Sequence, residues 1–423
     1  MKQVLRARVL LALLVLGAST GATAGDAAPG ATVESLLSLA RERNPEYAGM
    51  RQEAQAASER IEPAGNLPDP KLRIELMDIT KMGEQSPTLW PSNVGSTRYT
   101  FMQDVPWFGK RDLKRDIAAQ EAQGASGRAL GTWAELSSRI KSGYAQFYYL
   151  HQSERLTREI LDLMARLEQV AQARYAGGLA AQQDVIRAQV EQSNMKNELI
   201  ALENEQRVVQ ARLNALVARP ANAPLMTPQS LRPIPAPSQL DYGILEAKVR
   251  EHSPQLFALD AQIKAARSNR ELTYKNRYPD FTLGIFPTQY GNAFPDWSLM
   301  VEVNIPFQQS SRRSQEREAE GMLAAAESRR ETSANQVLTE LAENLSGLDA
   351  ARRTEMNTST RLRPQAELAS QSALASYENG KVDFATLLDA QRQIRQAKQS
   401  QIKAQLEAQV RLAEIEKLIG EDL

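Results

Sequence analysis

The pattern of hydrophobic and polar positions predicts very long helices. No proline occurs between Arg111 and Tyr175, and a helix of about 65 residues would be about 100 Å long. Within it, apolar residues recur at spacings of four and three, which is typical of a coiled coil: Leu156, Ile160, Leu163, Leu167 and Val170. Gly177 and Gly178 end this pattern. A second apolar stripe then predicts a helix that returns alongside the first: Ile186, Val190, Leu199, Leu202, Leu213 and Leu216.

Four short segments instead alternate between apolar and polar residues: 71–79, 98–105, 281–286 and 297–305. In the last segment, Leu299, Val301 and Val303 alternate with polar neighbours. Strands of about 8–10 residues with one apolar face have the length of a transmembrane β-strand. A small soluble hairpin packed on a helix would show the same alternation. We therefore expect a mainly α protein with a small transmembrane β part of four strands per chain.

The chain is internally duplicated, with matching features in the same order about 200 residues apart. The matches are Asn44-Pro45 with Ser253-Pro254, LPDPKL (67–72) with YPDFTL (278–283), Val105-Pro106 with Ile305-Pro306, and YAGGL (175–179) with YENGK (377–381). We expect a first repeat over 25–218, a proline-rich linker over 219–240 and a second repeat over 241–423. Each repeat should contain a helix, a strand pair (71–105 or 281–305) and a long helical hairpin with its tip at 177–178 or 379–380.

Two finer expectations concern single helices. The first helix is predicted over 33–62 with Thr32 as its N-cap, because threonine side chains accept a hydrogen bond from the first turn. In the second repeat, the return helix follows Asn379-Gly380 through an apolar stripe that includes Leu387, Leu388 and Leu412. Pro364 lies inside the preceding long helix and should kink it.

The first 24 residues predict a signal peptide. They begin with Lys2 and Arg6, continue with an apolar run over 9–18, and end at Ala22-Thr23-Ala24. A signal anchor is the alternative, although the apolar run is about half of the ~20 residues that span a bilayer.

Composition excludes several classes of site. The chain has no cysteine, so disulfides, thiolate metal sites, a cysteine nucleophile and a lipoprotein anchor are excluded. The two histidines, His151 and His252, are too far apart in sequence to suggest a multi-histidine site. The formal net charge is +0, which argues against a nucleic-acid partner. Met77, Met82 and Met102 cluster around the first strand pair and could bind a soft metal, but methionine there is more often a packing residue. No cofactor or metal site is expected.

Geometry then limits the assembly. Four strands cannot close a barrel, and open strand edges are not tolerated in lipid. Three chains would supply twelve strands, and the helical hairpins would extend such a barrel as a tube. The pattern therefore favours a conduit whose far end lies at the two hairpin tips.

Several segments resemble the TolC family of outer-membrane efflux ducts, closest to its CzcC- and CusC-like heavy-metal branch. They are VPWFGKR (105–111), YAGGLAAQQDVIRAQ (175–189), IPF (305–307) and YENGKVDFATLLDAQR (377–392). The resemblance implies a homotrimer in the outer membrane, with a 12-stranded barrel that continues into a periplasmic helical tunnel. It also implies docking to a periplasmic adaptor and an inner-membrane RND pump. The chain lacks the cysteine of lipidated members, so the barrel alone would anchor it.

The resemblance also suggests functional residues. The adaptor would contact the tips at Gly177, Gly178, Leu179, Asn379, Gly380 and Lys381, although these glycines would also serve as helix C-caps. A gate at the tunnel mouth would be formed by Asp184, Arg187, Asp383, Thr386 and Asp389. Threefold symmetry would gather each carboxylate into a ring and raise its pKa. Arg187 could neutralise the ring by pairing with Asp389 of an adjacent hairpin. The alternative is that these are solvated charges on helix faces.

Other functions fit less well. A periplasmic adaptor would have one helical hairpin and a β-rich remainder. An enzyme is not expected, because Asp383 and Asp389 lie beside a turn without a phosphate loop or nucleophile elbow nearby. Within the channel class, a duct for organic drugs or type I protein secretion remains the alternative to heavy-metal cations.

Overall fold

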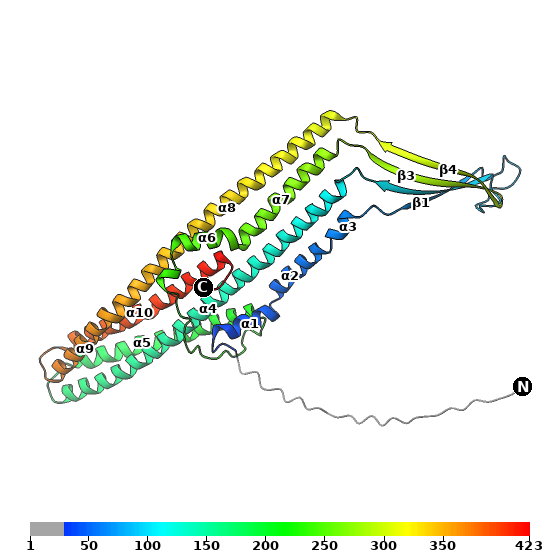
Figure 1. Cartoon of the computed structure of the whole chain (residues 1–423). Helices are drawn as coiled ribbons and strands as arrows, with labels where there is room; N and C mark the ends of the chain where they lie inside the picture. Colours follow the sequence, from blue (N-terminus) through cyan, green and yellow to red (C-terminus); the bar gives the residue numbers. More distant parts are fainter. Residues whose placement is uncertain (1–28) are drawn as a thin grey trace, which may run out of the picture.

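The computed structural model describes residues 29–423 as one long molecule with a sheet at one end and two helical hairpin tips at the other (Figure 1). The predicted signal peptide lies outside the described residues. The strands are β1 (Lys71–Met77), β2 (Ser96–Val105), β3 (Asp280–Tyr290) and β4 (Ala293–Asn304). The helices are α1 (Val33–Arg43), α2 (Pro45–Ser58), α3 (Ile61–Gly65), α4 (Lys110–Ala176), α5 (Gln182–Leu216), α6 (Tyr242–His252), α7 (Pro254–Lys275), α8 (Gln309–Asn357), α9 (Arg363–Glu378) and α10 (Phe384–Ile419), with a 3-10 turn η1 (Pro237–Gln239) and a π turn η2 (Thr358–Leu362). The expected mainly α fold with four strands is confirmed.

The first helix differs from the prediction over 33–62, because three helices occupy this segment. Pro45 has no backbone N–H and begins α2, while the Asn44 side chain caps that helix by accepting from Tyr47 N at 3.0 Å. Thr32 precedes α1 but makes no side-chain capping bond. The second repeat has the same break, where Pro254 begins α7 after Ser253.

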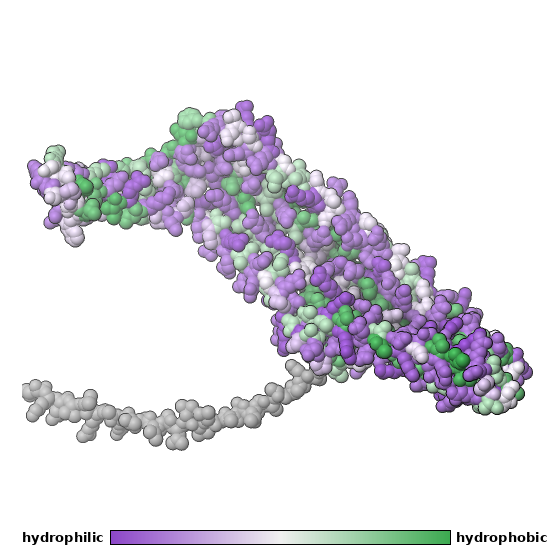
Figure 2. All heavy atoms as spheres, turned by 180° about the vertical axis from the view of Figure 1, so that it is seen from behind, coloured by the Kyte–Doolittle hydropathy of each residue, from purple (hydrophilic) through white to green (hydrophobic). Residues whose placement is uncertain are grey.

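The four strands form one antiparallel sheet in the order β1-β2-β3-β4. Exposed apolar residues occupy one face of the sheet: Leu72, Ile74, Phe101, Leu283, Ile285, Leu299, Val301 and Val303. In Figure 2, green hydrophobic areas lie over the sheet end of the molecule, while the helical part is mostly hydrophilic. The opposite face carries polar residues that include Lys71, Asp104 and Glu302. β3 and β4 extend beyond the predicted segments, whereas β1 ends two residues before Ile79.

The junction between strands and helices is rigidly packed. Trp107 stacks on Tyr278 with ring centroids 5.1 Å apart. Lys110 is buried at the start of α4 and donates to Asp280 at 2.8 Å. Because Trp107 and Lys110 follow β2 while Tyr278 and Asp280 border β3, these contacts hold the two repeats together below the sheet.

The helices pack side by side and bury three apolar clusters. One joins α1, α2, α4 and α5, the second joins α6, α7, α8 and α10, and the third lies near the tips between α4, α5, α9 and α10. The predicted coiled-coil seam of α4 is confirmed, since Leu156, Ile160 and Leu167 are buried in the third cluster. Among residues 29–423, no helix is long and apolar enough to cross a membrane.

The predicted return stripe of α5 is only partly buried within the chain. Leu213 is buried, but Ile186 and Val190 remain 50% and 53% exposed. The reason is that α5 packs mainly on α4, and α9 packs mainly on α10, so α5 and α9 lie at the two ends of the row α5-α4-α10-α9. The outward side of α5 therefore has no neighbour in the described part of the chain.

Pro364 interrupts the second long helix as expected. It lies in the first turn of α9, directly after the π turn η2. A proline cannot donate to the preceding turn, and a π turn is a common way to accommodate the lost bond.

Candidate functional site

The two hairpin tips have the same backbone geometry, a Schellman motif. At the first tip, Leu179 N donates to Arg174 O at 2.7 Å and Gly178 adopts φ 71°. At the second, Lys381 N donates to Ser376 O at 2.8 Å and Gly380 adopts φ 69°. A positive φ strains most residues that carry a side chain, so glycine is favoured at these two positions. The tip residues predicted from the sequence thus lie together at the end of the molecule farthest from the sheet (Figure 1).

The tips present exposed side chains beyond their capping bonds. Leu179 is 71% exposed, and a Cβ added at Gly178 would meet no heavy atom within 4 Å. Lys381 is also exposed, while Asn379 donates its side-chain amide to Ala375 O at 2.7 Å. An exposed leucine on a rigid turn is available for a protein contact.

Arg174 connects the two tips. Its Nη1 donates to Tyr377 O at 2.7 Å and Glu378 O at 3.0 Å, the last carbonyls of α9. A cation at a helix C-terminus is favoured by the helix dipole, and the guanidinium also lies 5.0 Å from the Tyr377 ring centroid. Sequence reasoning missed this residue. The available signal was the difference between the repeats, since Ser376 occupies the position that corresponds to Arg174.

Tyr377 is a second functional candidate that the sequence did not reveal. Its side chain is 2% exposed and packs edge-on against Phe384 with centroids 5.5 Å apart. Its hydroxyl is buried and has no hydrogen-bond partner in residues 29–423. Burial, and then the negative charge of Asp184, raise the pKa of Tyr377. The Asp184 carboxylate therefore disfavours ionisation of the Tyr377 hydroxyl near the hairpin tips.

Asp383 is the N-cap of α10. Its carboxylate accepts from Thr386 N at 2.9 Å and from Thr386 Oγ1 at 2.6 Å. The hydroxyl and backbone N–H of Thr386 lower the pKa of Asp383, and the charge of Arg187 lowers it further. Two of the predicted gate residues are thus bonded to each other, and Arg187 acts on Asp383 within the same chain.

Asp389 lies two turns further along α10 and is exposed. Gln393 donates to its carboxylate at 3.4 Å, and the described residues contain no ion pair of Asp389 or of Arg187. The predicted pairing of Arg187 with Asp389 joins adjacent hairpins and stays a prediction. All five predicted gate residues lie in the first turns of α5 and α10 or at their N-caps.

Ion pairs bridge α10 to α5 just beyond these residues. Arg395 pairs with Glu198 at 2.9 Å, and Arg392 pairs with Glu191. Because α5 and α10 both pack on α4, these long side chains hold the two hairpins together near the candidate gate.

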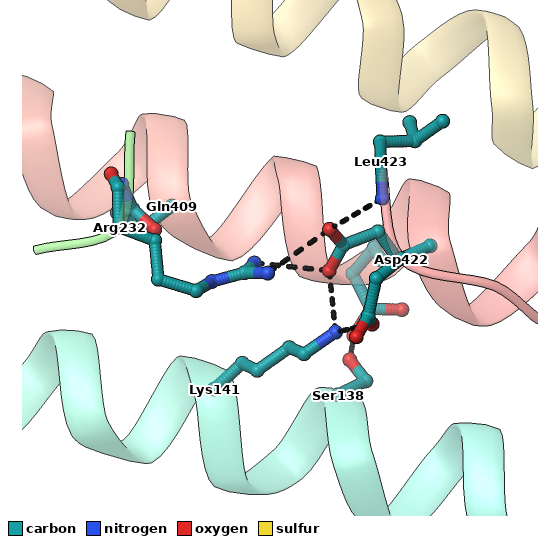
Figure 3. Close-up of polar contacts among 8 residues, drawn as sticks. Ser138, Lys141, Arg232, Gln409, Asp422 and Leu423 are labelled. Atoms are coloured by element: carbon teal, nitrogen blue, oxygen red, sulfur yellow. Dashed lines mark hydrogen bonds and ion pairs between the residues drawn. The ribbon is translucent and has the colours of Figure 1, made fainter. Parts of the chain in front are cut away.

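A buried charge cluster fixes the hairpins halfway along the molecule (Figure 3). Lys141 of α4 and Glu416 of α10 pair at 2.7 Å, with side chains 3% and 2% exposed. Arg232, from the proline-rich linker, donates to both oxygens of Glu416 at 3.0 and 2.9 Å, and Gln409 donates to Arg232 O at 2.6 Å. Removing one partner of a buried pair costs about 3–5 kcal/mol, so this cluster ties the linker to the helices.

The described residues contain no group of three or more histidine, aspartate or glutamate side chains that could hold a metal. Met77 and Met102 lie at opposite ends of β1's ladder with β2, and Met82 is 93% exposed in the following loop. The methionine cluster suggested by the sequence is therefore not formed.

The described residues form a sheet with open edges at one end and paired helical hairpins at the other. This architecture is typical of a channel-forming protein rather than of a compact enzyme. The chain belongs to the outer membrane efflux protein family, whose model matches residues 36–219 and 245–421. The predicted resemblance is confirmed. The chain is therefore an outer membrane efflux protein and not an enzyme.

One relative is the cobalt-zinc-cadmium resistance protein CzcC of Cupriavidus metallidurans, 24% identical over 381 residues that cover 88% of this chain and 86% of CzcC. The outer membrane protein VceC from Vibrio cholerae has a similar structure, with a TM-score of 0.78 and 17% identity over 92% of this chain and 96% of VceC. CusC is similar too, with a TM-score of 0.77 and 16% identity over 92% of each chain. The two structures show that the fold is shared.

Proposed function

We propose that the protein is the outer-membrane exit duct of a tripartite efflux system and conducts heavy-metal cations out of the periplasm. The observation that carries this proposal is the relation to CzcC, a cobalt-zinc-cadmium resistance protein, along 88% of the chain.

A homotrimer is supported by the open strand edges of the sheet and by the exposed apolar residues on the outer helices. In the described residues, β1 and β4 each pair with one strand only, and open edges are costly in lipid. The end helices carry matching apolar residues, which are Ile186, Val190 and Ile200 on α5 and Met356, Leu362 and Leu368 along α8, η2 and α9. Joining α5 of one copy to α9 of the next buries both sets at similar heights above the tips. Three copies then close twelve strands into a barrel, with the apolar face of the sheet against lipid.

The hairpin tips are proposed to dock on the periplasmic adaptor, which connects the duct to an inner-membrane RND pump. Gly178→Trp adds a large side chain at an exposed turn, where a Cβ would meet no heavy atom within 4 Å. We expect this variant to form trimers but to lose adaptor cross-linking and metal resistance. Gly178→Asn is the matched control, because asparagine tolerates the left-handed conformation. Full resistance of the tryptophan variant would contradict docking at this tip.

Asp184, Arg187, Asp383, Thr386 and Asp389 are proposed to form the gate at the tunnel mouth. Within one chain, Asp383 and Thr386 stabilise the start of α10. Asp389 is exposed and free to meet Arg187 of the neighbouring copy, so this contact would hold the mouth closed until the adaptor separates the tips.

The proposal is tested by deleting the gene in its host and measuring growth with added Co²⁺, Zn²⁺ or Cd²⁺ and with apolar antibiotics. We expect metal tolerance to fall, antibiotic tolerance to stay unchanged, and the wild-type gene to restore metal tolerance. Sensitivity to antibiotics alone would instead indicate a duct for organic compounds, and loss of a secreted protein would indicate type I secretion.

A further inference from the structure

Two methionine side chains meet over a glycine on the polar face of the sheet. In register, Met102 of β2 and Met300 of β4 are the two cross-strand neighbours of Gly284 in β3. A Cβ placed on Gly284 would lie 3.0 Å from Met300 Cε and 3.4 Å from Met102 Cγ. Met300 is also the single residue of β4 that is not exposed. The two thioether side chains therefore share the space above Gly284.

Charges of both signs surround this pair, and Lys71 of β1 is the cross-strand neighbour of Met102 in the same row. Asp104, Thr282 and Glu302 form the next row on the same face. Asp104 is already bonded to Lys71 at 2.8 Å and to Thr282 Oγ1 at 2.7 Å. Glu302 is exposed and has no ion pair within residues 29–423. The methionine pair thus has an uncompensated carboxylate beside it.

Packing alone explains why methionine covers a glycine, because its flexible side chain fills irregular gaps. Phe286 and Met77 are further apolar residues on this face, whereas leucine, isoleucine and valine occupy the other face. Thioether sulfur is a soft ligand that selects soft metals such as Cu(I) over harder cations.

We propose that Met102 and Met300 form a weak binding site for a soft monovalent cation, Ag⁺ or Cu⁺, with Glu302 compensating its charge. The inference rests on the proposed function in one respect, that the polar face of the sheet lines the conduit. Weak binding suits a passage, since a cation must be able to leave each site that it enters.

The test uses the full-length protein in detergent with [methyl-¹³C]methionine, titrated with AgNO₃ in chloride-free buffer. Met82 and Met322 are exposed and serve as isolated thioethers in the same sample. Because two linked ligands act at high effective concentration, the Met102 and Met300 methyl resonances should shift at about tenfold lower Ag⁺ than these two. Zn²⁺ at equal concentration should shift neither.

Met102→Leu separates a shared site from two independent side chains. In this variant we expect the Met300 resonance to shift only at an Ag⁺ concentration at least as high as the one that shifts the exposed methionines. Met322→Leu is the control and should leave both resonances unchanged. Leucine replaces methionine at nearly constant volume, and equal trimer migration on a gel checks that the fold is kept.

Simultaneous titration of all methionines, or an unchanged Met300 response in Met102→Leu, would overturn the site. These outcomes leave metal tolerance in the host untouched, so they are distinguishable from failure of the proposed function. Ag⁺ binding in a protein whose deletion changes no metal tolerance would contradict the proposed function alone.

Discussion

Residues at corresponding positions of the two hairpins have different structural roles. Asp383 caps α10, whereas Ala181, at the corresponding position before α5, has no capping side chain. Arg174 binds the C-terminus of α9 across the tips, while Ser376 has no such role. The two tips therefore share their backbone geometry but differ in the roles of their side chains.

The cap makes a prediction about pH. The pKa of Asp383 is lowered in the folded chain, so its ionised form stabilises the fold above the ordinary carboxyl pKa of about 3.9. This contribution is lost as the pH falls through the lowered pKa. We expect the thermal midpoint of the helical circular dichroism signal to fall more in the wild type than in Asp383→Ala between neutral pH and about pH 2.

Asp383→Asn is the control for this prediction, because asparagine caps a helix without a titrating charge. Its thermal midpoint should exceed that of Asp383→Ala at neutral pH and show no loss from this position in acid. Parallel pH curves for the wild type and Asp383→Ala would mean that the cap contributes nothing.

At the scale of elements, periodicity predicted most of what was found. The seam through Leu156 and Leu167, the alternation around Leu299 and the turn at Gly380 each follow from local spacing. The spacing of apolar residues does not show which helix an apolar stripe packs against. The sequence predicts that Ile186 packs on the preceding helix of the same chain, but in the structure it is 50% exposed. Contacts between distant segments, such as Arg174 with Tyr377 and Arg395 with Glu198, leave no local pattern and could not be predicted.

The sheet offers a prediction in which neighbouring residues are matched controls. Leu299 lies on the apolar face and is 82% exposed, while Ser298 lies on the polar face of the same strand. Leu299→Arg places a charge against lipid at a cost of about 2–4 kcal/mol at the bilayer midplane, and should reduce the heat-modifiable trimer extracted from membranes. Ser298→Arg should leave trimer levels unchanged. An equal loss of trimer in both variants would argue that the apolar face of the sheet does not face lipid.

At the scale of the whole molecule, we propose that the chain is one segment of a larger wall. Its lateral surfaces, α5 at one end of the helix row and α9 at the other, both carry exposed apolar residues. The strand edges β1 and β4 lie at the two ends of the sheet. Both features favour the addition of further copies side by side. Such a row of copies closes into a ring when the rotation between neighbouring copies allows it.

Cysteine cross-linking can test this contact cleanly, because the chain has no cysteine. Val190 and Leu368 each lie about three helical turns from the glycine of their own tip, Gly178 and Gly380. We expect the double variant Val190→Cys with Leu368→Cys to form disulfide-linked dimers and trimers on a non-reducing gel. Val190→Cys alone should not. A folded monomer in light scattering would contradict the conduit itself.

The gate prediction depends on the closed ring, since Arg187 and Asp389 would meet between copies. Arg187→Glu replaces an attraction with repulsion, widens the resting mouth and should raise single-channel conductance in planar bilayers. Asp389→Ala removes the attraction and should have a smaller effect in the same direction, because exposed pairs contribute about 0–1 kcal/mol. Arg207→Glu is the control, with the same charge change about five turns further along α5, where Arg207 pairs with Glu203 in its own helix. Conductance that stays at the wild-type value in both Arg187→Glu and Asp389→Ala would exclude an ion-pair gate at these residues.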